Sequence, residues 1–311
     1  MKRIGAVLLS VAAWALMARP AFAQTKPLRV ACVLKTLSSQ YWKIVAAGAK
    51  DAAAKNNVEL LLAGPPSEDD VEQQINMIED AIVKRPAVLL VAPSQPPTVI
   101  PSLEKARKLG IPVILVDTDV AWPPKATFIG TTNVNAGKQG GQYLSTLLSK
   151  GDKVVLIDGA PGNPACGDRI KGAERALKSA GMIIAAVQPG YSDRDKAMTV
   201  MQNILQAQPD VKAVFAANDE MALGSLRALQ QAGKKVPVIG TDGIADAAKS
   251  ILAGELAGTV AQQPYDMGRL AVEAAVKLAQ GQKVEPRVDS GTKMITRQNA
   301  QAQLEFLAKI Q

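Results

Sequence analysis

Short apolar runs alternate with amphipathic segments along the chain from Leu28 onwards. The apolar runs are nearly continuous, which is typical of strands buried on both faces of a parallel sheet. The segments between them, such as YWKIVAAGAKDAAAKNN and DDVEQQINMIEDAIVKR, carry apolar residues at helical spacing. Alternating strands and helices predict an α/β fold with parallel sheets. The clearest strand candidates read LRVACVL, VELLLA, AVLLVAP, IPVILVD, KVVLID, KAVFAA and VPVIGTD.

The same series of segments occurs twice, with an offset of about 125 residues. Gly48 in one expected helix aligns with Gly172 in another, and Asp117 after IPVILV aligns with Asp242 after PVIGT. This period is too long for a solenoid repeat and fits two similar α/β domains. A chain of 311 residues also exceeds one typical hydrophobic core.

Two similar domains that face each other bring the carboxyl ends of both sheets to a shared cleft. Open α/β sheets bind ligands at those ends, and ligand pockets form preferentially at domain interfaces. The sequence therefore predicts a two-domain clamp that holds its ligand between the domains.

Asp117 and Asp242 directly follow equivalent strands of the two halves. Either carboxylate alone could cap a helix or close a turn, but their equivalence favours contact with one shared ligand. Carboxylates accept hydrogen bonds from hydroxyl groups, which suits a polyhydroxylated ligand. Asn218 ends the strand AVFAA and can both donate and accept, whereas we expect Asp219 to cap the helix that follows.

Other candidate contacts are a pair of cations and a few aromatic rings. Arg169, at the start of a helix, could place a fork of donors over ring and hydroxyl oxygens, and Lys35 at a strand end could do the same or face solvent. Aromatic residues make up only 4% of the chain, so Tyr41 and Trp42 stand out. They either attach a helix to its sheet or cover the C–H face of a sugar, and Tyr191 could form the opposite wall.

The composition argues against several classes of function. The chain contains no histidine, which excludes histidine-based triads and most zinc sites. The glycine-rich stretches GKQGG and GAPGNPACG lack the ending of a phosphate-binding loop. The formal net charge is +8, but without a basic block or interleaved aromatic residues nucleic acid is not an expected partner. We predict no catalytic residue, no metal ion and no cofactor.

Residues 1–23 have the pattern of a secretory signal peptide. MKR supplies a positive start, IGAVLLSVAAWALMA an apolar stretch too short for a membrane span, and AFA a cleavage site that ends at Ala23. Cys32 and Cys166 could pair after export. Because Cys32 lies in an expected strand and Cys166 in a loop of the other half, two separate thiols are expected instead.

Several stretches resemble the periplasmic sugar-binding proteins of ABC importers. VMQNILQAQPDVKAVFAANDEMALGSLRALQQAG is similar to the ribose-binding members, and VLKTLSSQYW, GPPSEDD, VIGTDG and TVAQQP are similar to the allose-binding members. The resemblance implies two Rossmann-like lobes, the type I periplasmic binding protein fold, with chain crossings near Thr131, Gln262 and Pro286. The first lobe would hold residues 27–131 and 263–287, and the second residues 132–262 and 288–311.

The resemblance also implies a function. A monosaccharide such as ribose or allose, or a related polyol, would be trapped by hinge closure and delivered to a permease in the inner membrane. The protein would be a periplasmic monomer that could also serve a chemoreceptor. Together with the residues above, the expected ligand contacts are Lys35, Tyr41, Trp42 and Asp117 in the first lobe, Arg169, Tyr191, Asn218 and Asp242 in the second, and Gln262 at a crossing.

Three positions depart from the ribose-type pattern. Thr118 stands where that pattern has an arginine, and Ser38 and Ser39 stand where it has two asparagines. Ser192 replaces the aromatic residue of the second lobe, with Tyr191 one place earlier. Ser39 and Thr118 therefore join the expected contacts of a smaller, less cationic pocket, and ribose is not assumed to be its ligand.

Other functions remain open from the sequence. An exported carbohydrate-active enzyme would need two carboxylates roughly 5–10 Å apart across a sugar bond, which Asp117 and Asp242 could provide only in a closed form. A sugar or signal receptor for chemotaxis would share the binding site. The effector core of a transcription regulator shares the fold, but carries a helix-turn-helix where this chain has its expected signal peptide.

Overall fold

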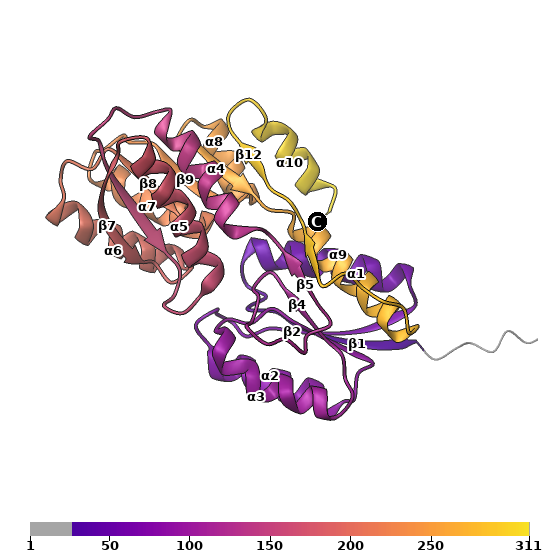
Figure 1. Cartoon of the computed structure of the whole chain (residues 1–311). Helices are drawn as coiled ribbons and strands as arrows, with labels where there is room; N and C mark the ends of the chain where they lie inside the picture. The colour runs from indigo at the N-terminus through magenta and orange to yellow at the C-terminus, as the bar shows by residue number, and fades with distance from the viewer. Residues whose placement is uncertain (1–26, 311) are drawn as a thin grey trace, which may run out of the picture.

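The computed structural model describes residues 27–310, and Figure 1 shows two lobes that lie side by side. Each lobe contains one six-stranded sheet, in the order β11-β5-β4-β3-β1-β2 in the first and β12-β10-β9-β8-β6-β7 in the second. Neighbouring strands are parallel except β10 and β12, which are antiparallel. These sheets confirm the predicted α/β fold. The expected signal peptide lies outside the described residues.

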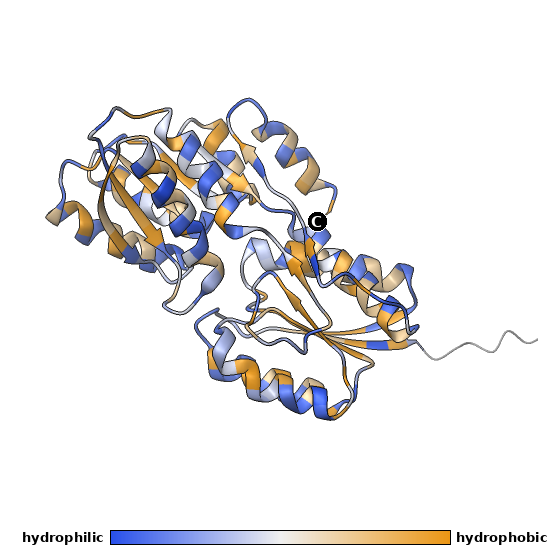
Figure 2. Ribbon diagram, viewed as in Figure 1, coloured by the Kyte–Doolittle hydropathy of each residue, from blue (hydrophilic) through white to orange (hydrophobic). Residues whose placement is uncertain are grey.

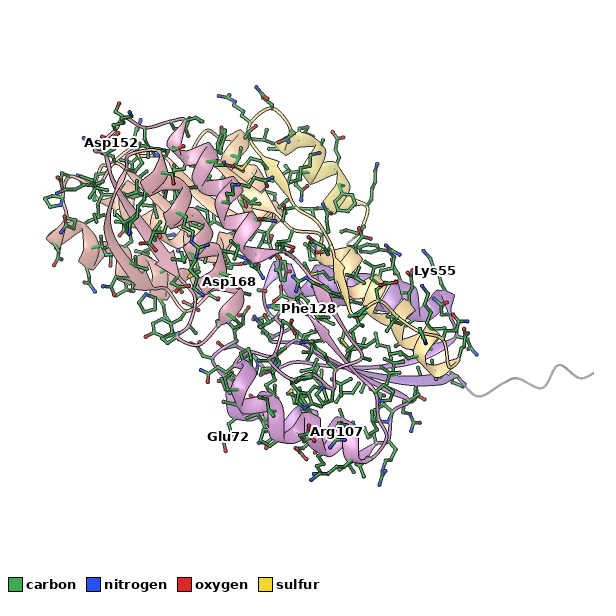
Figure 3. The ribbon with its side chains drawn as sticks, viewed as in Figure 1. Lys55, Glu72, Arg107, Phe128, Asp152 and Asp168 are labelled. Carbon is green, nitrogen blue, oxygen red and sulfur yellow. The ribbon has the colours of Figure 1, made fainter. Side chains whose placement is uncertain are left out.

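The strands fall where continuous apolar runs predict them. The first sheet contains β1 (Leu28–Val33), β2 (Val58–Ala63), β3 (Val88–Val91), β4 (Val113–Val116), β5 (Thr127–Gly130) and β11 (Arg287–Asp289). The second contains β6 (Lys153–Asp158), β7 (Ile183–Pro189), β8 (Ala213–Ala216), β9 (Val238–Asp242), β10 (Gly258–Ala261) and β12 (Lys293–Ile295). Strands β3, β4, β8 and β9 are buried along their whole length. Charged side chains such as Lys55, Glu72 and Arg107 point outward (Figure 3).

Helices cover both faces of each sheet. In the first lobe, α1 (Gln40–Lys55) and α9 (Pro264–Ala279) pack on one face, and α2 (Val71–Val83) and α3 (Pro96–Lys108) on the other. In the second lobe, the packed pairs are α4 (Asn133–Ser145) with α5 (Pro164–Ser179), α6 (Arg194–Ala207) with α7 (Asp219–Gln231), and α8 (Ala245–Leu252) with α10 (Ala300–Ala308). In Figure 2 the strands are mostly hydrophobic, and the helices carry a hydrophobic side and a hydrophilic side.

Within residues 27–310, no helix combines the length and the apolarity that a membrane crossing requires.

Glycines let paired helices touch backbone to backbone. A Cβ atom on Gly48 of α1 would clash with the carbonyl oxygen of Tyr265 on α9. A Cβ atom on Gly172 of α5 would clash in the same way with the carbonyl oxygen of Val134 on α4. The sequence repeat that aligns Gly48 with Gly172 therefore reflects one helix contact that occurs in both lobes.

The chain passes between the two sheets three times. The first two passages follow β5 and β10, and the third lies between β11 and β12. Because β11 still pairs with β5 of the first sheet, the lobe boundary expected after residue 287 is too early. The first and third passages are joined by hydrogen bonds from Thr132 Oγ1 to Asp289 Oδ2 (2.6 Å) and from the Ser290 N–H to the Gly130 carbonyl (3.0 Å).

Candidate ligand-binding site

A cavity lies between the two lobes and is called the inner cavity below. Its empty volume, together with the adjoining solvent-open space, is about 270 Å³. Its walls come mostly from the carboxyl ends of strands and from the loops and helix starts that follow them, as expected for two facing α/β domains. Eight of the expected contacts line it: Lys35, Tyr41, Trp42, Asp117, Arg169, Asn218, Asp242 and Gln262. The lining also includes Glu68, Asn163, Ala165, Cys166 and Ser192.

Asp117 follows β4 and is the centre of the first-lobe wall. Its Oδ2 accepts a 2.8 Å hydrogen bond from the Tyr41 hydroxyl, and its Oδ1 accepts one of 2.8 Å from Thr118 and lies 3.4 Å from Lys35 Nζ. Burial raises the pKa of Asp117, but the charges of Lys35 and Arg169 outweigh burial and hold that pKa below its ordinary value. Asp117 is therefore an ionised acceptor. Lys35 is only 2% exposed, so the alternative that it faces solvent is wrong.

Trp42, in the first turn of α1, gives the inner cavity an aromatic wall. Its Nε1–H donates a 2.7 Å hydrogen bond to Glu68 Oε1, and the Tyr41 ring meets it edge to face with 5.1 Å between centroids. Lys35 Nζ lies 5.6 Å from the Trp42 ring centroid. Burial raises the pKa of Glu68, and Lys35 offsets only part of this effect. Burial also lowers the pKa of Lys35, but Asp117 and Glu68 outweigh it, so Lys35 stays charged.

Asp242 ends β9 and is the second-lobe counterpart of Asp117. Its Oδ1 accepts a 2.7 Å hydrogen bond from Gln262 Nε2 and lies 3.5 Å from Arg169 Nη1. No donor among the described residues bonds to Oδ2 of this carboxylate. Burial raises the pKa of Asp242 well above its ordinary value, with Arg169 opposing the rise and Asp219 adding to it. The backbone φ of Asp242 is 134°, a conformation that non-glycine residues rarely adopt.

Arg169 is a buried donor that neighbouring acceptors hold in place. Its Nε donates a 2.8 Å hydrogen bond to Asn133 Oδ1, and its Nη1 donates one of 2.9 Å to the Ala217 carbonyl. The backbone beneath it is held by α4, because a Cβ atom on Gly137 would clash with the Arg169 carbonyl oxygen. The guanidinium therefore reaches the inner cavity from a rigid helix pair.

Asn218, and not Asp219, caps α7. The Asn218 Oδ1 atom accepts a 2.9 Å hydrogen bond from the Met221 N–H, so the prediction that Asp219 is the cap is wrong. Both side chains have capping chemistry, and Asp219 is already the first helical residue. The amide nitrogen of Asn218 makes no hydrogen bond to the described residues, and this side chain lines the inner cavity.

Asp219 lies fully buried behind Asp242. Its Oδ2 accepts the N–H groups of Gly243 (2.8 Å) and Ile244 (3.0 Å), and its Oδ1 accepts the Thr259 hydroxyl (2.6 Å). Burial raises the pKa of Asp219 to about 6, although these hydrogen bonds lower it. Asp219 thus holds the backbone that directly follows Asp242 and positions that carboxylate without lining the inner cavity.

The inner cavity combines acceptors, donors and an apolar surface. The carboxylates of Asp117 and Asp242 can accept hydrogen bonds from hydroxyl groups, and Lys35 and Arg169 can donate to oxygens. Trp42 adds a flat apolar face. In the part of the chain that the structure describes, no group of three or more His, Cys, Asp or Glu side chains is placed to hold a metal ion. The arrangement suits a small molecule with several hydroxyl groups.

Comparison with known proteins decides the family. Residues 30–283 match the periplasmic binding protein domain, which is more than half of the chain. The chain belongs to the periplasmic binding protein family. It is 34% identical over 299 residues to the ribose import binding protein of Escherichia coli (strain K12), covering 96% of this chain and 99% of that protein. It is 36% identical over 267 residues to the D-allose-binding periplasmic protein of the same organism, covering 82% and 86%.

Solved structures of periplasmic binding proteins agree with the fold. A solute binding protein from Actinobacillus succinogenes 130z with bound D-allose has a TM-score of 0.83 at 29% identity, covering 89% of this chain and 100% of that one. A carbohydrate transporter solute binding protein from Agrobacterium radiobacter in complex with D-arabinose has a TM-score of 0.85 at 27% identity, covering 90% and 98%. The resemblance and the two-lobed fold predicted from the sequence are confirmed.

Three expected contacts of this periplasmic binding protein lie outside the inner cavity. Ser39 is the N-cap of α1, and its Oγ accepts the Trp42 N–H at 3.5 Å. Thr118 donates its hydroxyl hydrogen bond to Asp117. Tyr191 is 36% exposed and lines a different space. Ser39 and Thr118 therefore support lining residues, whereas Tyr191 is directed elsewhere.

The sequence prediction missed four polar or thiol residues of the cavity wall, namely Glu68, Asn163, Cys166 and Ser192. Glu68 lies in the run SEDD, whose three carboxylates look alike in sequence. Asn163 is the N-cap of α5 and precedes a proline, a helix-start signal that could have drawn attention to it. Burial raises the pKa of the Cys166 thiol to about 11. Cys32 and Cys166 are both free, which confirms the expectation of two separate thiols.

Proposed function

We propose that this periplasmic binding protein is the solute-binding protein of an ABC importer and captures a monosaccharide or a related polyol in the inner cavity. The observation that carries the proposal is the convergence of Asp117 and Asp242 on one cavity from equivalent strand ends of the two lobes. Relatives named for ribose and D-allose, and solved structures with D-allose and D-arabinose, support a sugar. A relative named for xylitol and a structure with bound glycerol extend the candidates to polyols.

Each lobe supplies partners for ligand hydroxyl groups. Asp117 and the Oδ2 atom of Asp242 accept hydrogen bonds, and Lys35, Arg169 and the Asn218 amide donate them. A hydrogen bond to a charged group contributes roughly 1.5–3 kcal/mol, and a buried group left without its partner costs a similar amount. The site therefore selects molecules whose hydroxyl groups match this set and rejects analogues that lack one of them.

Closure of the two lobes retains the ligand. Trp42 covers the apolar C–H face of the ring, while two contacts connect the lobes around the ligand. Lys196 of the second lobe pairs with Asp69 of the first, and the Asp246 N–H donates a 3.3 Å hydrogen bond to Gln40 Oε1. A ligand that bridges both lobes stabilises the closed state in proportion to its greater affinity for that state. The permease then recognises the closed form.

The proposal places the mature protein in the periplasm, where it acts as a monomer without catalysis, metal ion or cofactor. Its partners are the ligand and an inner-membrane permease, and a chemoreceptor could use the same closed form. The positions of Thr118 and Ser192 set the site apart from the ribose-type pattern, so a pentose other than ribose, a hexose or a polyol fits the proposal as well as ribose does.

The test begins with the ligand that the protein carries through purification. Native mass spectrometry of protein purified without denaturation is expected to show a bound neutral species with the mass of one sugar or polyol. Melting curves with a panel of pentoses, hexoses and polyols should then show that the same compound raises the melting temperature. The proposal fails if no small molecule co-purifies and no member of the panel changes the melting temperature.

A further inference from the structure

A second and larger space lies beside the inner cavity, between the same two lobes. This outer chamber has an empty volume of about 760 Å³, and like the inner cavity it is partly open to solvent. Glu68 from the first lobe and Asn163 from the second line both spaces, so the two spaces meet at these side chains. A group attached to a molecule in the inner cavity would meet the outer chamber at Glu68 and Asn163.

The aromatic residue of the second lobe belongs to the outer chamber. Tyr191 and Ser192 both adopt left-handed backbone conformations, with φ of 59° and 56°. Tyr191 thereby lines the outer chamber, while the small Ser192 lines the inner cavity. The rings that line the inner cavity, Tyr41 and Trp42, both come from the first lobe. An aromatic surface is thus available to a group bound outside the inner cavity.

A cation lies next to this second aromatic ring, and other polar residues line the same chamber. Lys196 Nζ lies 5.3 Å from the Tyr191 ring centroid and also pairs with Asp69 of the opposite lobe. Because that pair joins the lobes, the outer chamber takes its shape only when they are closed. Glu68, Asp69, Ser94, Gln95 and Asn163 also line the chamber. An aromatic face with nearby donors and acceptors is the combination that a hydroxylated ring requires.

We propose that the outer chamber holds a second sugar unit, glycosidically linked to the ring in the inner cavity, so that the protein accepts disaccharides as well as the free monosaccharide. This inference rests on the proposed function, because it assumes that a sugar occupies the inner cavity. The first ring is recognised by the buried charges, and the second packs on Tyr191 and meets the polar groups around it.

Calorimetry with chemically modified sugars tests whether the two spaces are continuous for a ligand. D-Ribose, D-arabinose, D-allose, D-glucose and D-galactose are titrated first, followed by each mono-O-methyl derivative of the sugar that binds best. One derivative, methylated at the hydroxyl that faces the outer chamber, is expected to bind within about fivefold of the free sugar. The others should bind about 100-fold more weakly, because a filled site has no room for the added methyl group. The disaccharide linked through the tolerated position should then bind at least as well as the monosaccharide.

Tyr191→Ala provides the matched test of the outer chamber. It is expected to weaken binding of the disaccharide about tenfold, which is typical of a truncated aromatic contact, and to change binding of the monosaccharide less than twofold. Tyr265→Ala is the control, because the Tyr265 hydroxyl bonds to Asp51 and the residue lines neither space. It should leave both affinities unchanged.

The outcomes separate this inference from the proposed function. If the monosaccharide binds but every methyl derivative and disaccharide is rejected, the outer chamber is not a binding site and the proposed function stands. Equal weakening of both ligands by Tyr191→Ala also overturns the inference, since Tyr191 would then act through lobe closure. If no sugar binds in any form, the proposed function fails as well.

Discussion

The Nζ atom of Lys35 lies 3.4 Å from Oδ1 of Asp117, and the two side chains are only 3% and 4% exposed. Lys35 follows β1 and Asp117 follows β4, so the pair spans β3, which lies between those strands in the sheet. Loss of one partner from a buried ion pair leaves the other charge without compensation, which costs roughly 3–5 kcal/mol. The wall of the inner cavity is therefore coupled to the stability of the first lobe.

Lys35→Met is expected to lower the free energy of unfolding by about 3 kcal/mol. Sugar binding should also weaken at least tenfold or so, because one donor is lost and the pKa of Asp117 rises without its neighbouring cation. Denaturant unfolding and calorimetry measure the two effects. The double variant Lys35→Met/Asp117→Leu removes both charges, and it should recover much of the stability but none of the binding. A single variant as stable as the wild type would contradict this account.

Asp219→Asn is expected to change how stability depends on pH. Burial raises the pKa of Asp219 to about 6 from an ordinary value of 3.8, so between these pH values the folded state binds more protons than the unfolded state. Stability then falls with rising pH, and the contribution of Asp219 decreases from about pH 4 to about pH 6 and stays constant above. Asparagine retains an oxygen for the Gly243 and Ile244 N–H groups but does not titrate.

Denaturant unfolding of both proteins from pH 4 to pH 8 measures this effect. The difference in unfolding free energy, Asp219→Asn minus wild type, should increase between about pH 4 and pH 6 and remain level at higher pH. A difference that is constant across the whole range would show that Asp219 does not titrate with a raised pKa in the folded protein.

Two glycine substitutions separate helix contact from helix propensity. Gly137→Ala should destabilise the protein by about 1–3 kcal/mol and weaken sugar binding, because the added methyl group pushes α5 away at Arg169. Gly167 lies in α5, two residues before Arg169, and has open space around its position. Gly167→Ala should therefore raise stability by about 0.5–1 kcal/mol and leave binding unchanged. Melting curves and calorimetry test both, and similar behaviour of the two variants would refute the packing argument.

The fold and the central carboxylates could be predicted because the same series of segments occurs twice in the chain. Continuous apolar runs mark the buried strands, and the repeat pairs Asp117 with Asp242 at equivalent strand ends. The exposure of Lys35 remained open in the sequence because a lysine at a strand end can face solvent or cavity with equal ease. Only the buried position of Asp117, two strands away, decides between these alternatives.

Other details of the site depend on which of two adjacent residues takes a given position, and the local sequence does not determine this. Asn218 and Asp219 have the same capping chemistry, and the end of β8 decides which of them caps α7. Two successive left-handed residues decide that Ser192, and not Tyr191, lines the inner cavity. Glu68 is distinguished from its acidic neighbours by the indole Nε1–H of Trp42, which donates a hydrogen bond to it across the fold.

Calorimetric titration of the wild type, Asp117→Asn and Asp242→Asn with the sugar identified by mass spectrometry tests the central claim most directly. These two residues lie at strand ends of different lobes, and the account holds that one ligand bridges them. Each single substitution is therefore predicted to weaken binding roughly 10- to 100-fold, the loss expected when a buried hydrogen bond to the ligand is removed. If either variant binds the sugar as tightly as the wild type, the ligand is not held between the lobes and the account is contradicted.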